Sequence, residues 1–364
     1  MRDRLFSLLV CPSCHSPFAL QEFARRGDQV SDGVLTCTAC GAAYPIVSDI
    51  PRIFKGAWQE HFEWQTRYAS QLAALAAAIG ADRPGEKRDA KIRTKASFGY
   101  QWTSFSEMAV EFEHNFLKYV EPLQPSFFPN KLGLDAGCGF GRHIFYAARY
   151  GAEMVGIDYS AAIESTQRNT AHLPNVHLVQ ADIYCLPFRP GTFDFVYSLG
   201  VLHHLPQPLD AFLALKRLVR GGGVCAVWLY SKTRRHMNAA LELVRRVTPW
   251  LPFPLLKAIS WLAAVIDWCL FTYPYKILSA TPLRGLLDRI VFDRVKVYAI
   301  YPFHVTYADW FDRLSPPIRF YYDEPDLVEW AKAADLSDVV ITPTGKYGWR
   351  LQGRVAGEPP TASN

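Results

Sequence analysis

The chain has 364 residues, of which 50% are hydrophobic, and a formal net charge of +5. This length allows a sizeable core and more than one domain, as expected of a globular protein. Because Lys and Arg are spread along the chain, the modest charge does not by itself argue for a nucleic-acid partner.

The N-terminal segment MRDRLFSLLVCPSC contains an apolar run that ends at a Cys-Pro pair. This run is too short for the hydrophobic core of a signal peptide with a cleavage site. We therefore expect a cytoplasmic protein.

The eight cysteines fall into two groups. Two C-x-x-C pairs, Cys11 with Cys14 and Cys37 with Cys40, can each lie on a tight turn and present two thiolates to one tetrahedral zinc ion. The four cysteines at positions 138, 185, 225 and 269 stand singly and are expected to be core thiols. Cysteines without metal, or a redox pair, are the alternative to structural zinc. We expect residues 1–55 to form a zinc-ribbon domain that is folded largely by its metal.

Residues 5–54 resemble the small zinc-ribbon family related to the activator subunit of tRNA and protein methyltransferases. The resemblance rests on LLVCPSC and on LTCTACGAAYPIVSDIPRIF, in which the second cysteine pair is followed by Tyr44-Pro45-Ile46 and Asp49-Ile50-Pro51. It implies an accessory module that stabilises or positions a methyltransferase.

Residues 56–97 are predicted to form a helical linker. An alanine-rich run, QLAALAAAIG, leads into the polar and turn-rich ADRPGEKRDAKIRTK, where we expect an exposed connection with a mobile stretch around residues 80–92. Aromatic residues then precede an amphipathic helix. Packing against the sheet edge is the favoured explanation for them, with Tyr100 and Trp102 as cofactor or substrate candidates.

From residue 131 the chain alternates short apolar runs with helical patterns, which predicts an α/β fold with a parallel sheet and helices on both faces. The run Leu132 to Ala136 meets a turn, GCGFG, whose glycines let a ligand approach main-chain N–H groups at a helix start. Four acids are expected at or near strand ends, where ligands bind in such sheets: Asp135, Asp158, Asp182 and Asp194.

A dinucleotide would also fit a glycine turn followed by an acid about twenty residues later. Two details argue against it. Arg142 stands where the dinucleotide fingerprint needs a third glycine, and Asp135 before the glycines suits a cationic amino acid better than a pyrophosphate. Asp182 could in turn accept a hydrogen bond from an adenine amino group, with the Ile183 backbone beside the ring.

The segments LDAGCGFGR, GIDYS, ADIYCLPF and FDFVYSLGVLHHL resemble the successive motifs of class I S-adenosylmethionine-dependent methyltransferases. The resemblance implies a Rossmann-like methyltransferase core in residues 98–231, with S-adenosylmethionine as cofactor. The cofactor contacts that it implies are Asp135 near the ammonium, directly or through water, and Gly137, Cys138 and Gly139 at the methionine part; Asp158 at the ribose hydroxyls, with Tyr159 along the adenine; Asp182 and Ile183 at the adenine edge; and Ser198, Leu199 and Gly200 near the sulfonium.

Methyl transfer needs a general base only when the nucleophile must lose a proton, and the pKa of histidine suits that role. His203 and His204 follow the fourth strand, at the mouth of the expected cleft. We name His203 as the catalytic candidate, with a structural or cofactor role as its alternative, and expect His204 to be structural.

Residues 232–300 are predicted to form an apolar helical cap, inserted before the last part of the methyltransferase domain and the tail, 301–364. Lys257 and Asp267 interrupt its main apolar run, which disfavours a membrane span. A lid over the active site is the first interpretation, and a patch that meets a membrane or a greasy substrate is the second. Five residues at the exit of the cap could face the acceptor: His304, Tyr307, Trp310, Asp312 and Arg313.

These patterns predict a methyltransferase acting on a small-molecule or lipid-linked acceptor, preferably at oxygen, with structural Zn²⁺ in the ribbon. Peripheral membrane contact is expected, if anywhere, through residues 236–290. Nucleic acid is not expected as a partner, because Arg25 and Arg26 are the only basic cluster in the ribbon and because the hydrophobic insert would be a poor RNA surface. Two alternatives remain: an RNA methyltransferase whose ribbon holds RNA, and a cofactor-binding interaction module without catalysis.

Overall fold

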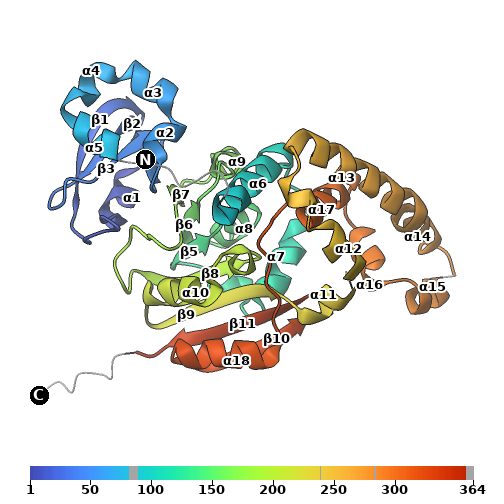
Figure 1. Cartoon of the computed structure of the whole chain (residues 1–364). Coiled ribbons are helices and arrows are strands. Elements are labelled where there is room, and N and C mark those ends of the chain that lie inside the picture. The colour runs from blue at the N-terminus through green and yellow to red at the C-terminus, as the bar shows by residue number, and fades with distance from the viewer. Residues whose placement is uncertain (82–88, 238, 283, 358–364) are drawn as a thin grey trace, which may run out of the picture.

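Figure 1 shows the computed structural model of the chain, which describes residues 1–81, 89–237, 239–282 and 284–357. Among these residues, eleven strands form one mixed sheet with the order β1-β2-β3-β4-β7-β6-β5-β8-β9-β11-β10. The predicted α/β fold is confirmed. The stretch around residues 80–92, predicted to be mobile, lies partly outside the described residues.

Seven strands form the part of the sheet that belongs to the predicted core. They are β5 (Leu132–Ala136), β6 (Glu153–Asp158), β7 (Val176–Ala181), β8 (Phe193–Leu199), β9 (Val219–Tyr230), β10 (Leu336–Thr344) and β11 (Gly348–Val355). The first five run parallel, and β11 pairs antiparallel with both β9 and β10. The carboxyl ends of the parallel strands therefore meet at one edge, where ligands bind in such sheets.

Helices cover both faces of these strands, which explains why the strands read as nearly continuous apolar runs. One face carries α10 (Pro208–Arg217) and α18 (Glu324–Ala333), and the other carries α7 (Phe112–Val120), α8 (Arg142–Arg149) and α9 (Ile163–Thr170). On the first face Phe212 stacks on Trp330 at 5.4 Å. On the second face the fully buried Phe116 packs against Phe128 and Tyr146.

The N-terminal ribbon is built into the same sheet. It consists of α1 (Asp3–Leu8), β1 (Phe18–Arg26), β2 (Gln29–Cys37), β3 (Ala43–Val47) and β4 (Ile50–Ile53). Strands β1 to β4 pair antiparallel with one another, and β4 then pairs in parallel with β7, with Arg52 opposite Gln180. The ribbon and the core therefore share one continuous hydrogen-bonded sheet.

Arg52 is the buried polar link of this junction. Its side chain is 1% exposed, donates to Gln180 Oε1 at 2.9 Å and to the Val47 carbonyl at 3.0 Å, and forms an ion pair with Glu164 at 2.6 Å. A buried guanidinium needs such partners, because removing an unpaired charge from water costs several kcal/mol.

Short helices follow the ribbon and pack on it: α2 (Ala57–Glu60), α3 (Phe62–Arg67), α4 (Ala69–Leu72), η1 (Ala73–Leu75) and α5 (Ala76–Ala81). The indole of Trp58 donates to the Ala43 carbonyl at 2.9 Å, and that of Trp64 donates to Asp32 Oδ1 at 2.7 Å. Helix α6 (Ala90–Ser104) comes next, and the predicted boundary at residue 97 falls inside it.

The predicted cap is helical and gathers on the side of the molecule away from the ribbon (Figure 1). Its elements are α11 (Lys232–Met237), α12 (Ala239–Val244), η4 (Thr248–Trp250), α13 (Phe253–Asp267), η5 (Trp268–Thr272), α14 (Tyr273–Leu278), α15 (Arg284–Ile290) and α16 (Asp293–Tyr298), and α17 (Phe303–Leu314) follows it. Helix α13 packs on α17, where the Trp310 indole donates to Asp267 at 2.7 Å. The run 253–278 is long and apolar enough to cross a membrane by length and composition, with a mean hydropathy of 1.6.

Candidate functional site

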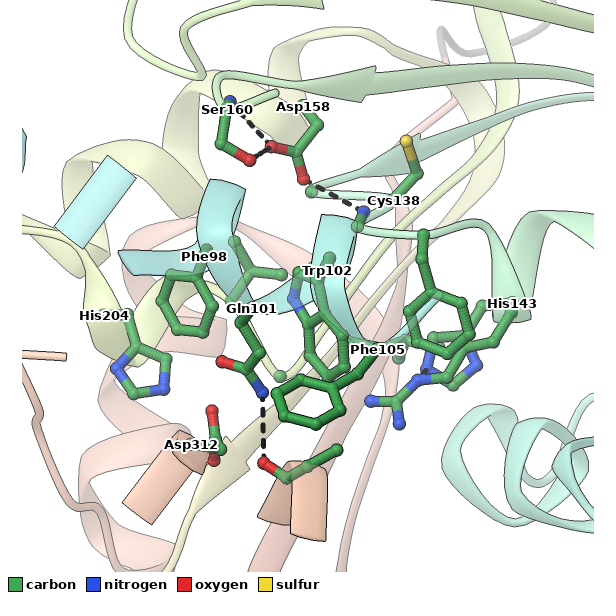
Figure 2. Close-up of a pocket in the computed structure, with 18 of the residues that line it drawn as sticks. Phe98, Gln101, Trp102, Phe105, Cys138, His143, Asp158, Ser160, His204 and Asp312 are labelled. Atoms are coloured by element: carbon green, nitrogen blue, oxygen red, sulfur yellow. Dashed lines mark hydrogen bonds between the residues drawn. The ribbon is translucent and has the colours of Figure 1, made fainter. Parts of the chain in front are cut away.

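A cavity of about 240 Å³ lies at the carboxyl ends of the parallel strands, between α6 and α17. Figure 2 shows Asp158 and Ser160 at one end of it and His204 and Asp312 at the other, with Trp102 between them. The amide of Gln101 donates to the Ala308 carbonyl at 3.4 Å, which ties α6 to α17 across the opening.

The glycine turn after β5 forms one wall of the cavity. Gly137 has φ +86°, and a Cβ there would lie 2.5 Å from a methyl of Val201, so only glycine fits. The Gly139 amide donates to Asp158 Oδ2 at 2.9 Å. The turn thus places main-chain groups beside the carboxylate at the end of β6.

Asp158 is fixed by its neighbours. Its Oδ1 accepts from the Ser160 amide at 2.8 Å and from the Ser160 hydroxyl at 2.7 Å. Burial raises the pKa of Asp158, and the hydrogen bonds from Ser160 and Gly139 oppose that rise. Since a carboxylate offers about four lone-pair directions, Asp158 can still accept from a ribose hydroxyl.

The opposite wall of this end is formed by Asp182, which follows β7. Its Oδ1 accepts from the Tyr184 amide at 3.1 Å, and the ammonium of Lys91 forms an ion pair with its Oδ2. The same ammonium lies 4.6 Å from the centre of the Tyr184 ring and 5.4 Å from that of Tyr159. Lys91, near the start of α6, was not predicted from the sequence.

The cavity brings together most of the predicted cofactor residues. Those that line it are Gly137, Cys138, Gly139, Asp158, Tyr159, Asp182, Ile183, Leu199 and Gly200. Asp135 and Ser198 do not, and the Ser198 hydroxyl donates to the Ala136 carbonyl at 2.8 Å. Of the two aromatic candidates, Trp102 lines the cavity, whereas Tyr100 stacks on Phe253 at 5.0 Å.

Asp135 lies buried in β5, just before the glycine turn. It is 1% exposed, and burial raises its pKa to about 8. Its Oδ2 has no hydrogen-bond partner among the described residues, and a cofactor ammonium could supply one, directly or through water. Asp194, by contrast, lies near the start of β8 and accepts from the Leu132 amide at 2.7 Å, so it belongs to the opposite edge of the sheet.

His203, the catalytic candidate, is fully buried and stacks on Tyr230 with ring centres 3.8 Å apart. The cavity is lined instead by His204, which was expected to be structural. The Tyr230 hydroxyl donates to Asp312 at 2.9 Å, and the Arg234 guanidinium lies 3.9 Å from the Tyr230 ring centre.

Of the five residues predicted at the exit of the cap, only some reach the cavity. His304 and Asp312 line it. Tyr307 and Trp310 face α13 instead. The Tyr307 hydroxyl donates to the Lys257 carbonyl at 3.1 Å, and the Trp310 indole donates to Asp267 at 2.7 Å. Arg313 forms an ion pair with Asp309 at 2.6 Å.

The four paired cysteines converge at the tip of the ribbon. Their sulfur atoms all lie within 4.8 Å of one another, with Cys11 to Cys40 at 3.6 Å and Cys14 to Cys37 at 3.4 Å. Tetrahedral zinc with Zn–S bonds of about 2.3 Å requires sulfur atoms about 3.8 Å apart. The residues therefore fit the predicted structural zinc site.

Two family models match the chain. Residues 134–227 match the methyltransferase domain, and residues 2–48 match Trm112p-like proteins. The chain therefore carries an S-adenosylmethionine-dependent methyltransferase domain and a Trm112p-like ribbon with a four-cysteine site, which confirms both resemblances.

Named relatives cover only parts of the chain. The tRNA U34 carboxymethyltransferase of Pseudoalteromonas translucida is 28% identical over 184 residues, which are 46% of this chain and 55% of the relative. That of Vibrio cholerae is 37% identical over 112 residues, 29% of this chain and 33% of the relative. Magnesium protoporphyrin IX methyltransferase from Synechocystis, solved with SAH, has a TM-score of 0.43 at 15% identity, covering 74% of this chain and all of that one. The chain thus spans about half or less of these two curated relatives.

Proposed function

We propose that this chain, which joins a Trm112p-like zinc ribbon to a class I methyltransferase domain, modifies RNA, with tRNA as the substrate class. The observation that carries the proposal is the match to relatives named for tRNA modification. The ribbon supports the proposal, because residues 2–48 are similar to Trm112p-like proteins, the family related to the activator subunit of tRNA and protein methyltransferases. The cytoplasmic location predicted from the sequence agrees with such a substrate.

The prediction of a small-molecule or lipid-linked acceptor methylated at oxygen is wrong, because the named curated relatives act on tRNA. The same names contradict the prediction that nucleic acid is not a partner. The membrane contact predicted through residues 236–290 belonged to the same partner prediction and is not proposed. The alternative of an RNA methyltransferase is better supported by these relatives.

The charge of the cap supports an RNA substrate. Residues 232–300 contain eleven Lys and Arg but four Asp and Glu, so the cap carries +7 while the whole chain carries +5. Six of these cations are exposed: Lys232, Arg235, Arg246, Lys276, Arg284 and Arg289. Trp250 and Trp261 of the cap are also exposed, and aromatic side chains combined with cations suit stacking of unpaired bases over a phosphate backbone.

Within the cavity, the chain would hold the cofactor by its ribose at Asp158 and by its adenine beside Ile183. When bound, S-adenosylmethionine supplies an activated methyl group, and the protein contributes mainly by positioning the acceptor and excluding water. The aromatic residues of α6 and the polar residues of α17 would surround the acceptor, since both helices line the cavity.

The test is transfer of label from methyl-labelled S-adenosylmethionine into cell extract separated into RNA, protein and small-molecule or lipid fractions. We expect label in tRNA, and mass spectrometry of the digested nucleosides then identifies the modified base and the group added. Label confined to another fraction would refute the proposal. Cofactor binding without transfer to any fraction would favour a non-catalytic module.

A further inference from the structure

His204 presents a bare ring nitrogen to the cavity. The Nδ1 atom lies 2.7 Å from the Ile318 carbonyl oxygen. Because a carbonyl can only accept, Nδ1 must carry the hydrogen of this bond. In the neutral ring the lone pair is therefore on Nε2, and the histidine lines the cavity while only 3% exposed.

The surroundings keep this ring in place and uncharged. Its centre lies 4.9 Å from that of Phe98 on α6 and 5.4 Å from that of Tyr230 on β9. Burial, helped by Arg319 and Arg234, lowers the pKa of His204 to about 4, against the opposing effects of Asp312 and the Ile318 carbonyl. The lone pair is thus free at physiological pH.

Asp312 is the anionic partner at this end. It reaches the cavity from α17 and is held by the Tyr230 hydroxyl, which donates to its Oδ2 at 2.9 Å. Figure 2 places His204 and Asp312 at the same end of the cavity, away from Asp158. A proton taken up by His204 would therefore form an imidazolium whose charge Asp312 partly stabilises, against the larger effect of burial.

We propose that His204 Nε2 is the general base of the acceptor site, assisted by Asp312, and that the acceptor nucleophile is a group that bears a proton. This inference rests on the proposed function for the nature of the acceptor. As the bond from the nucleophile to the transferred carbon forms, the bond from that carbon to sulfur breaks and leaves a neutral thioether. The proton of the nucleophile passes to His204 Nε2. No reactant beyond cofactor and acceptor is needed.

The chain offers a precise pair of substitutions. In His204→Asn the side-chain amide can still donate to the Ile318 carbonyl, but nothing replaces Nε2. In His204→Gln the amide reaches the position of Nε2 but cannot take up a proton. Asp312→Asn keeps an oxygen that accepts from Tyr230 and removes the charge. His172→Asn, at an exposed histidine between α9 and β7, is the matched control.

The measurement is the single-turnover rate of label transfer from S-adenosylmethionine to total tRNA. Both His204 variants should bind the cofactor as the wild type does and lose about 100-fold or more in rate, as expected for loss of a general base. Asp312→Asn should lose less, and His172→Asn should lose nothing. Transfer by His204→Asn at the wild-type rate would overturn the inference.

A second readout needs no acceptor. In ¹⁵N-histidine NMR spectra of the full-length protein with SAH, His204→Gln identifies the His204 signals. The hydrogen on Nδ1 supports the inference, and a hydrogen fixed on Nε2 overturns it. If the wild-type protein labels no RNA, the proposed function fails, while the tautomer still decides whether His204 can serve as a base.

Discussion

The ammonium of Lys91 forms an ion pair with Asp182, the carboxylate predicted to accept a hydrogen bond from the adenine amino group. Both oxygens of Asp182 are engaged, one by Lys91 and the other by the Tyr184 amide. Lys91 lies in the second position of α6, and α6 also contributes Phe98 and Trp102 to the cavity. Cofactor binding and the position of α6 are therefore expected to be linked.

Lys91→Ala should tighten binding of S-adenosylmethionine, because the adenine no longer competes with an ion pair. A partly exposed pair is worth at most about 1 kcal/mol, which corresponds to about fivefold in the dissociation constant. Isothermal titration calorimetry measures this, with the exposed Lys118→Ala as control. Weaker binding by Lys91→Ala would mean that Lys91 holds the cofactor instead.

Asp158→Ala should lose cofactor binding by about 100-fold or more, since hydrogen bonds to a charged group contribute about 1.5–3 kcal/mol each. The variant also frees the Gly139 amide that Asp158 accepts from, which loosens the turn. Asp158→Asn should fall between it and the wild type. Asp210→Asn on the exposed side of α10 is the control. Unchanged affinity of Asp158→Ala would refute the assignment of the ribose site.

Cys11→Ser should remove zinc and expose the ribbon to proteases, because a segment of this size depends on its metal for folding. Zinc content by mass spectrometry and limited proteolysis report the two effects. Cys185→Ser, outside the cluster, should change neither; Cys185 and Cys269 were predicted to be core thiols, but both are exposed. Full zinc occupancy in Cys11→Ser would show that the four thiols are not one site.

Arg52→Ala should lower the free energy of unfolding by about 3–5 kcal/mol, as expected when one partner of a buried ion pair is removed. Glu164 and Gln180 would be left without their partner. Arg52→Met, which fills the space without the charge, separates packing from pairing. Urea unfolding measures the loss. A similar loss in the exposed Arg26→Ala would argue against a special role of the junction.

The buried carboxyl of Asp135 should make stability depend on pH. Its pKa is raised to about 8 in the folded protein from an ordinary value of 3.8, so between these limits the folded chain holds a proton that the unfolded chain has released. The contribution of Asp135 to the free energy of unfolding is thus fully present at low pH. It decreases as the pH rises, by at most about 1.4 kcal/mol per pH unit. Asp135→Asn should flatten this slope between about pH 6 and pH 8 in urea unfolding. Equal slopes in both proteins would show that Asp135 is ionised.

The sequence predicted what is written in local patterns. The apolar run before GCGFG predicts a strand followed by a turn, and Asp158 marks the end of the next strand. The paired cysteines predict a metal site. Each of these patterns spans only a few residues. The pairing of Arg52 with Gln180 joins positions 128 residues apart, and that of Tyr230 with Asp312 joins positions 82 apart. Neither pair has a periodicity or spacing that reveals it.

His203 and His204 illustrate the same limit at a single step in the chain. Adjacent residues of one short turn point in different directions, and only the fold decides which one meets the cavity. The direction of His204 follows from the Ile318 carbonyl, which lies beyond the whole cap. A motif can therefore locate a turn at the cavity without identifying which of its side chains lines it.

The pairing of β4 with β7 joins the ribbon to the methyltransferase domain within one chain. Because the ribbon is covalently joined to the domain whose sheet it extends, its docking through β4 on β7 is intramolecular and does not depend on the concentration of the protein. A module on a separate chain would have to be made in a matching amount. Here each methyltransferase domain is synthesised with one ribbon, and dilution of the protein does not separate the two.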